Sequence, residues 1–366
     1  KYRDEGELYG LVLDSPQNRY DDYSYKMKYN YKISDTRRFK MSYLKEKYIK
    51  TSYYPYYYNL NENDYTVNGS QFKNGILDRQ EVNFQYHSNA EAYNRLYGLE
   101  VYNKNYSSFN IYKFNSDSLY QSSIFNGENS TKTDKDISLY YYEERKLKNR
   151  NILSYGLRIL NEESILLPSL SYLLKGNDDY NYRFSYSAGY RKPSIKELYY
   201  EWLDHAGPAI YGNSDLEPSR NNHFSISIDK RTSINDFSVI FYRNDIDNMI
   251  STEYIKDDDS EDDGELHYKN YDDVLISGVN VHYYRKITDK INLRFVYNLT
   301  DASSDSDEIL EGISKHAFRL SLYCKLLNNL DIIANLKYIG EKFVFDQEQD
   351  YNELPIIELS PYSLAD

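Results

Sequence analysis

The chain has 366 residues, and its 57 acidic and 44 basic side chains give a net charge of -13. An acidic chain offers no net electrostatic support to a nucleic-acid partner, so we expect none. Its only cysteine, Cys324, excludes an internal disulfide, a CxxC redox pair and a zinc site built from several cysteines. No stretch reaches the roughly 18 uninterrupted apolar residues of a spanning helix. An aromatic content of 16%, with 45 Tyr, argues against a disordered chain.

Apolar and polar residues alternate along much of the chain. Over 22–33, Tyr, Met and Ile occupy the odd positions, and Asp, Ser, Lys and Asn occupy the even ones. The same alternation recurs over 180–189, 224–229, 291–300 and 318–325. A two-residue period is that of a β-strand with one apolar and one polar face. The sequence therefore predicts an all-β chain of about fifteen strands, with no separate second domain.

The connections between these strands alternate in length. The short turns are expected at 34–37, 146–150, 176–179, 231–234, 286–290 and 327–329. The long polar connections are expected at 51–78, 103–134, 191–221, 245–273, 301–314 and 341–358. Short turns on one side and long loops on the other are typical of an outer-membrane barrel, whereas a β-sandwich mixes the two lengths at both ends. Aromatic girdles at the two membrane interfaces would use many of the tyrosines. We therefore predict a transmembrane antiparallel β-barrel.

A short glycine motif recurs in the predicted strands. Residues 96–101 and 154–159 share a core of Tyr, Gly, Leu and a charged residue, and 276–281 is a looser version of it. Glycine inside a strand marks a bend or the close approach of another group. We expect bends here, because repeated bends help a sheet to close.

The segment 188–224 has the features of an ordered loop. Pro193 has no amide hydrogen and is expected to end the strand before it. Ser194 and Glu197 have the spacing of a capping box, which predicts a short helix from Ile195 to about 203. Breaks are then expected at Gly207-Pro208 and Gly212-Asn213, and Glu217-Pro218 leads into the next strand.

Two short motifs in this segment resemble those of the TonB-dependent outer-membrane receptors. The first box is formed by Tyr190, Arg191, Lys192 and Pro193 at a predicted strand end, and the second contains Gly212, Asn213, Leu216 and Pro218 before the next strand. The likeness extends more loosely over about 96–362. Lys192 stands where this family usually has a small residue, and Ser219-Arg220 stands where an acidic residue is common. These departures weaken the assignment to a subfamily more than the prediction of the fold.

The resemblance implies a barrel of about 22 strands whose lumen is filled by an N-terminal plug domain. Residues 1–366 would then supply about strands 5 to 20 of that barrel. We expect the plug, the TonB-binding segment and the final strands to lie outside this sequence. The implied function is active transport of a scarce, bulky nutrient across the outer membrane of a Gram-negative bacterium, driven by the TonB-ExbB-ExbD complex through the missing N-terminal segment. Outer-membrane lipid is the other expected partner.

Ferric siderophores, haem, cobalamin and some glycans are ligands that this family implies. His205 lies between the two boxes, where haem receptors of the family carry a His. Because imidazole and tyrosinate both bind haem iron, a clamp could combine His205 with Tyr199, Tyr200 or Tyr211, with Trp202 stacking on the porphyrin. His205 is otherwise an ordinary loop residue. We expect an iron chelate, a ferric siderophore ahead of haem, as transported ligand and not as cofactor. A cobalamin or glycan receptor and a passive porin or adhesin are the alternatives.

Residues 257–263 form an acidic run in a predicted long loop. Its oxygens could bind calcium, but the spacing of an EF-hand loop is missing, so we expect a solvated loop and assign no metal.

The chain has no G-x-S-x-G elbow, H-E-x-x-H pair or G-x-x-x-x-G-K-[ST] loop. We therefore expect that the protein is not an enzyme.

Overall fold

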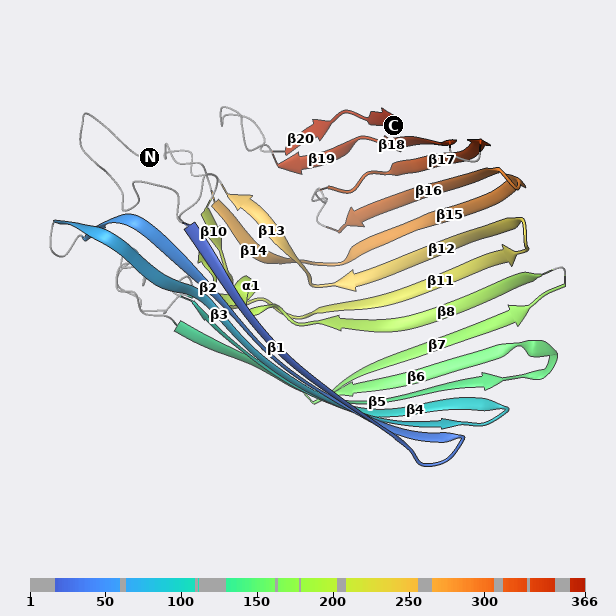
Figure 1. Cartoon of the computed structure of the whole chain (residues 1–366), viewed down its shortest axis with the longest axis horizontal. Helices are drawn as coiled ribbons and strands as arrows, with labels where there is room; N and C mark the ends of the chain where they lie inside the picture. The colour runs from blue at the N-terminus through green and yellow to red at the C-terminus, as the bar shows by residue number, and fades with distance from the viewer. Residues whose placement is uncertain are drawn as a thin grey trace.

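The chain folds around one large antiparallel sheet (Figure 1). The computed structural model describes residues 17–59, 64–108, 111, 130–161, 164–177, 179–202, 209–255, 265–305, 312–327, 330–345 and 356–365. Fifteen strands form the sheet in chain order, as the alternating pattern predicts. Within the described residues, β1 and β21 are its two edges. The described helices include none that is both long and apolar enough to cross a membrane.

The strands of the sheet are β1 (Gln17–Lys32), β2 (Arg37–Asn59), β3 (Asp64–Asn89), β4 (Tyr93–Ser108), β5 (Ser130–Lys146), β6 (Ile152–Leu160), β7 (Ile165–Lys175), β8 (Tyr180–Arg191), β11 (Ser219–Arg231), β12 (Asn235–Asp247), β15 (Val274–Thr288), β16 (Ile291–Ser304), β17 (His316–Leu327), β18 (Leu330–Ile339) and β21 (Tyr362–Ala365). A four-stranded sheet contains β13 (Met249–Ile255), β14 (Glu265–Tyr271), β10 (Ala209–Tyr211) and β9 (Glu201–Trp202). The remaining elements are the pair β19 (Lys342–Phe345) and β20 (Ile356–Leu359), the helix α1 (Ile195–Tyr199) and the 3-10 turn η1 (Lys148–Arg150).

The two ends of the sheet differ as the connection lengths predict. Short turns join the strands at one end, and the other end carries α1 and the small sheet of β9, β10, β13 and β14 (Figure 1). The prediction of a polar loop over 51–78 was wrong, because β2 and β3 continue as a paired hairpin to Asn59 and Asp64. The Tyr-rich sequence of this hairpin has a high strand propensity. The connection between β6 and β7 is also short, although it lies at the loop end.

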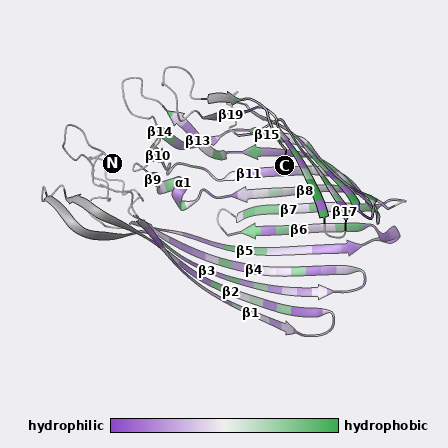
Figure 2. Cartoon of the chain, turned by 45° about the horizontal axis from the view of Figure 1, so that its top comes forward, coloured by the Kyte–Doolittle hydropathy of each residue, from purple (hydrophilic) through white to green (hydrophobic). Residues whose placement is uncertain are grey.

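The two faces of the sheet have different characters, and hydropathy alternates along its strands (Figure 2). The outer face exposes large apolar side chains, among them Leu139 at 56%, Leu166 at 58% and Phe184 at 48%. The register places Leu139 and Leu166 in one cross-strand row through Ile159. The opposite face is the inner one, because it packs against α1. Its side chains are rich in charged residues, as expected for a wet lumen.

The recurring strand glycines make room for aromatic rings. Gly98 lies opposite Tyr140, and a Cβ at Gly98 would lie 2.0 Å from the ring carbon Cζ of Tyr140. Gly278 lies opposite Tyr242, and a Cβ there would lie 2.1 Å from the backbone oxygen of Leu299 and 2.7 Å from the hydroxyl oxygen of Tyr242. These contacts explain the glycines by close approach, where the sequence led us to expect bends.

Candidate functional site

The connection from β8 to β11 contains both sequence boxes. The side chain of Ser194 accepts a hydrogen bond from the Glu197 amide at 3.2 Å, and the Glu197 carboxylate accepts one from the Ser194 amide at 2.7 Å. This confirms the predicted capping box. The helix ends at Tyr199 and not at about 203. It is shorter because Glu201–Trp202 pairs with β10 as strand β9, which ends the helical conformation.

The first and second boxes meet at this helix. The Arg191 guanidinium forms an ion pair with the Glu197 carboxylate. From the second box, the Asn213 amide donates to the Glu197 carbonyl at 2.8 Å, and the Gly212 amide donates to the Tyr200 carbonyl at 2.7 Å. A Cβ at Gly212 would lie 2.8 Å from the Tyr200 backbone nitrogen, so only glycine fits here. These box residues hold α1 against the end of the barrel wall.

The second box also joins the connection to β14. Leu216 is buried, and the Asn213 side-chain amide donates to the Tyr268 carbonyl at 3.0 Å. The Asn270 side chain accepts from the Glu217 amide at 2.8 Å and donates to the Glu217 carbonyl at 2.9 Å. The four-stranded sheet is thereby attached to the start of β11.

The remaining box residues mark the strand ends. Tyr190 pairs with Arg220 in the register of β8 and β11. Strand β8 ends at Arg191, two residues before Pro193, and Pro218 immediately precedes β11. The sequence predicted both boundaries, because a proline cannot donate a ladder hydrogen bond.

Two of the predicted ligand residues lie at the end of α1. The ring of Tyr199 contacts the ammonium group of Lys132, which lies 3.9 Å from the ring centroid. Tyr200 forms an isolated β-bridge with Ile111 and lines a cavity on the inner face. Their rings are therefore part of a cationic and aromatic region of the barrel wall.

The other predicted ligand residues do not form a described clamp. Tyr211, in β10, stacks on His267 with ring centroids 4.8 Å apart. Trp202 pairs with Ile210 through its backbone, and its side chain lies outside the description. His205 lies outside the described residues, so the proposed haem clamp stays a prediction.

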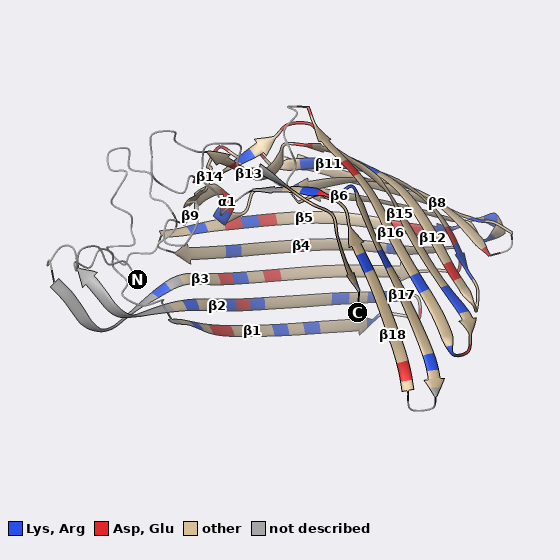
Figure 3. Ribbon diagram, turned by 90° about the horizontal axis from the view of Figure 1, so that it is seen from above, with Lys and Arg blue, Asp and Glu red and all other residues tan. Residues whose placement is uncertain are grey.

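A cavity of about 320 Å³ lies between α1 and the inner face of β2, β3 and β4. It is lined by Tyr48, Lys50, Gly75, Leu77, Lys104, Tyr106, Ser194, Ile195, Lys196 and Tyr200. We call it the lysine pocket. Its lining contains three lysines and no carboxylate. Basic and acidic residues follow one another along the part of β5 next to α1 (Figure 3).

The lysines of this pocket influence one another. Burial, followed by repulsion from Lys50 and Lys104, lowers the pKa of the Lys196 ammonium. The Lys196 nitrogen lies 5.2 Å from the ring centroid of Tyr200 and 5.8 Å from that of Tyr106. In the part of the chain that the structure describes, none of the three lysines forms an ion pair with a carboxylate. Among the described residues, three ammonium groups therefore lie beside two aromatic rings with no carboxylate in the lining.

A second cavity on the inner face, of about 240 Å³, has balanced charges. Arg158 forms an ion pair with Glu100. The Tyr102 hydroxyl donates to Asp134 at 2.5 Å, and Asp134 lies 3.9 Å from the Lys192 nitrogen. The lining of this cavity contains two carboxylates, those of Glu100 and Asp136, and two cations, those of Arg158 and Lys192, which distinguishes it from the lysine pocket.

The sequence did not single out Lys50, Lys104 or Lys132. Lys104 and Lys132 lie near the loop ends of β4 and β5, Lys50 lies further inside β2, and all three strands are far from α1 in sequence. Polar residues flank Lys104 and Lys132 in the sequence, so the local pattern does not assign them to a face, and the contact with α1 depends on the three-dimensional path of the β8–β11 connection. Among the described residues, no group of three or more His, Cys, Asp or Glu side chains is arranged to hold a metal ion. The acidic run 257–263 lies outside those residues.

Solved structures with a similar fold include two siderophore receptors and a copper transporter. A variant of the ferric enterobactin receptor of Pseudomonas aeruginosa aligns with a TM-score of 0.71 and 13% identity, over 95% of this chain and 53% of that one. The siderophore receptor PirA of Acinetobacter baumannii aligns with a TM-score of 0.70 and 16% identity, over 95% of this chain and 55% of that one. The copper transporter OprC aligns with a TM-score of 0.71 and 10% identity, over 94% of this chain and 56% of that one.

These likenesses show the fold, and the chain spans only about half the length of these receptors. The sequence itself matches the family described as "TonB dependent receptor-like, beta-barrel" over residues 3–366. This match covers nearly the whole chain and agrees with the antiparallel sheet, its short and long ends, and the two interlocked boxes. The chain therefore belongs to the TonB-dependent receptor β-barrel family.

Proposed function

We propose that this chain is the barrel wall of a receptor that imports an anionic ferric chelate, of the siderophore class, across the outer membrane of a Gram-negative bacterium. The lysine pocket is the observation that carries this proposal. It combines Lys50, Lys104 and Lys196 with the rings of Tyr106 and Tyr200 in one cavity at the loop end of the barrel.

The chemistry of the pocket suits an anionic aromatic chelate. A ferric tris-catecholate carries three negative charges and three aromatic rings. Three ammonium groups can balance its charge, and tyrosine rings offer apolar area on which catechol rings can pack. Burial and like-charge repulsion oppose the charged form of Lys196. An anion bound beside it would relieve that repulsion, so ligand charge and pocket charge are complementary.

Transport would follow the pattern of the family. Capture takes place at the loop end, and TonB-ExbB-ExbD supplies the energy through an N-terminal segment beyond this sequence. A plug domain would occupy the lumen near the charge-balanced cavity of Arg158 and Glu100. We assign no catalytic step and no resident cofactor to the chain.

The test is ligand binding by the full-length receptor in detergent, measured by calorimetry. The panel contains a ferric tris-catecholate, an uncharged ferric hydroxamate, haem, cobalamin and Cu²⁺. We expect the tris-catecholate to bind most tightly. Replacing Lys50, Lys104 and Lys196 together by Gln should weaken binding about 100-fold, since each lost charge pair contributes on the order of 1 kcal/mol in a solvated site.

A matched control carries the same change of net charge at the short-turn end, at the exposed residues Lys148, Lys175 and Lys290. Its affinity should stay within about twofold of the unmodified receptor. Equal losses in the two variants would reject the lysine pocket as the binding site.

Haem is the second ligand to be tested, because His205 lies between the boxes. A saturable Soret shift that His205→Ala abolishes would favour haem over a ferric siderophore. Preferred binding of cobalamin or a glycan would support those alternatives. Uptake that persists without TonB would favour a passive porin.

A further inference from the structure

The outer face of the barrel wall carries a group of charged side chains near its short-turn end. Arg95 is the third residue of β4, and Glu143 lies three residues before the end of β5. The register pairs these two residues, on the face that also exposes Tyr97 and Leu139. If the barrel spans the membrane as proposed above, short turns lie on the periplasmic side, and this group lies at the periplasmic interface.

Glu143 is enclosed by cationic side chains. Its side chain is 1% exposed, whereas those of Arg95 and Arg145 are 31% and 45% exposed. The Arg95 Nε and the Arg145 Nη2 each lie 2.8 Å from a Glu143 carboxylate oxygen. The Tyr141 hydroxyl also donates to this carboxylate. Two guanidinium groups and one carboxylate leave one positive charge next to the apolar side chains of Leu99 and Leu139 on this face.

The guanidinium groups retain donors for a second anion. Each guanidinium has five N–H donors. Arg95 uses its Nε on Glu143, and Arg145 uses its Nε and Nη2. In the described part of the chain, Glu143 is the only carboxylate with which either arginine forms an ion pair. Glu143 thus orients two partly exposed guanidinium groups, and a phosphodiester would match both their geometry and their net charge.

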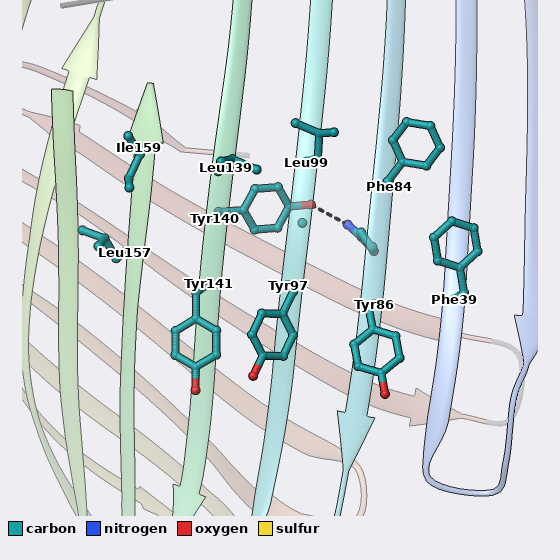
Figure 4. A pocket seen from close by; sticks show the side chains of 12 residues that line it. Phe39, Phe84, Tyr86, Tyr97, Leu99, Leu139, Tyr140, Tyr141, Leu157 and Ile159 are labelled. Atoms are coloured by element: carbon teal, nitrogen blue, oxygen red, sulfur yellow. Dashed lines mark hydrogen bonds between the residues drawn. The ribbon is translucent and has the colours of Figure 1, made fainter. Parts of the chain in front are cut away.

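An apolar depression adjoins this group. Its volume is about 430 Å³, and its lining includes Phe84, Leu99, Leu139 and Ile159. Three tyrosines from β3, β4 and β5 stand side by side at it, with their hydroxyls toward the short-turn end (Figure 4); they are Tyr86, Tyr97 and Tyr141. Their ring centroids are 6.1 Å and 4.9 Å apart. Tyrosine hydroxyls at the level of lipid headgroups, above an apolar surface, are typical of a membrane interface.

We propose that Arg95 and Arg145, held by Glu143, bind the phosphate of a periplasmic-leaflet phospholipid whose acyl chain lies in this depression. The occupant is a lipid and not free phosphate, because the charged group and the apolar depression share Tyr141. The proposal rests on membrane insertion of the barrel, but it does not depend on the identity of the transported ligand.

The test uses the full-length receptor in detergent and native mass spectrometry with two probes that have the same acyl chains. Dioleoylphosphatidylglycerol carries a phosphodiester, and dioleoylglycerol has none. In the test variant, Arg95→Gln, Glu143→Gln and Arg145→Gln are combined so that no carboxylate is left buried without a partner. We expect this variant to bind the phosphatidylglycerol about tenfold more weakly and the dioleoylglycerol unchanged.

The matched control replaces the ion pair of Arg158 and Glu100 on the inner face by two Gln residues. It should bind both probes like the unmodified receptor. Unchanged phosphatidylglycerol affinity in the test variant, or an equal loss in the control, would overturn the proposal. Arg145→Gln alone is the second variant, because Arg95 still pairs with Glu143; a partial loss is expected, and no loss would again overturn the proposal.

Liposome flotation of the same samples separates this inference from the proposed function. A receptor that floats but binds no ferric chelate refutes the uptake proposal and leaves the lipid result standing. A receptor that does not float refutes the membrane-spanning barrel itself, and the lipid site with it.

Discussion

Gly98 is a position at which a single methyl group should disturb the barrel wall strongly. A Cβ there would lie 2.0 Å from Cζ, 2.3 Å from Cε2 and 2.4 Å from the hydroxyl oxygen of Tyr140. The Tyr140 ring must therefore move. Its hydroxyl accepts a hydrogen bond from the side-chain amide of Gln85 at 3.0 Å and donates one to the side-chain oxygen of Asn83 at 3.2 Å. Moving the ring would break both bonds.

The expected magnitude follows from these contacts. Overpacking costs about 1–3 kcal/mol. Each lost hydrogen bond adds about 1 kcal/mol. Gly98→Ala should thus lower the free energy of unfolding by about 3–5 kcal/mol. At Gly189 the nearest atom to a new Cβ would be 3.5 Å away, in ordinary contact. Gly189→Ala should therefore change stability by no more than about 1 kcal/mol.

The assay is urea unfolding of the refolded full-length receptor in micelles, followed by heat-modifiable migration on a denaturing gel. A double-mutant cycle with Tyr140→Ala identifies the cause. Without the ring, Gly98→Ala should cost less than about 1 kcal/mol. The reasoning is refuted if Gly98→Ala is as mild as Gly189→Ala, or if its effect is the same with and without the Tyr140 ring.

Three further predictions concern the β8–β11 connection. Deleting 194–216 should abolish uptake and leave liposome flotation intact; loss of flotation would mean that the segment is needed to build the barrel. Arg191→Ala leaves the Glu197 carboxylate without its cation, so limited proteolysis should cut the connection faster, and Arg191→Lys should restore part of the protection. Burial raises the pKa of Glu201 to about 7, so its neutral form is the one that the fold favours. The neutral Glu201 side chain contributes fully to the stability of the β9–β10 region below its pKa in the unfolded chain, which is about 4.3. This contribution is lost as the pH rises to about 7. The protection factors for hydrogen exchange there, which are corrected for the base-catalysed intrinsic rate, should fall from about pH 5 to pH 8, and Glu201→Gln should remove this fall; an unchanged fall would assign it to another group.

Much of the fold could be predicted from the sequence, because the strand period is local information. The alternation over 22–33 is visible without knowing which strands are neighbours. The boundaries at Pro193 and Pro218 follow from the missing amide hydrogen. The capping box of Ser194 and Glu197 is likewise local, and it is present.

The lysine pocket could not be predicted in this way. Lys50 and Lys196 lie far apart in sequence, and their proximity depends on where the connection places α1. The early end of α1 has a similar cause, since Trp202 pairs with Ile210 of β10. Tertiary pairing of this kind overrides the local helix signal. Glu143 shows both cases, because Tyr141 and Arg145 lie two residues from it in its own strand, whereas Arg95 comes from β4 and depends on the strand register.

Uptake of radiolabelled ferric tris-catecholate tests the central claim most directly. Cells lacking other iron receptors would carry the full-length receptor, unmodified or with Lys50, Lys104 and Lys196 replaced by Gln, in the presence and absence of TonB. We predict TonB-dependent uptake by the unmodified receptor and a loss of at least tenfold at limiting ligand in the variant, with equal amounts of both receptors in the outer membrane. Uptake that the triple replacement leaves unchanged would contradict the claim that these lysines receive the ligand.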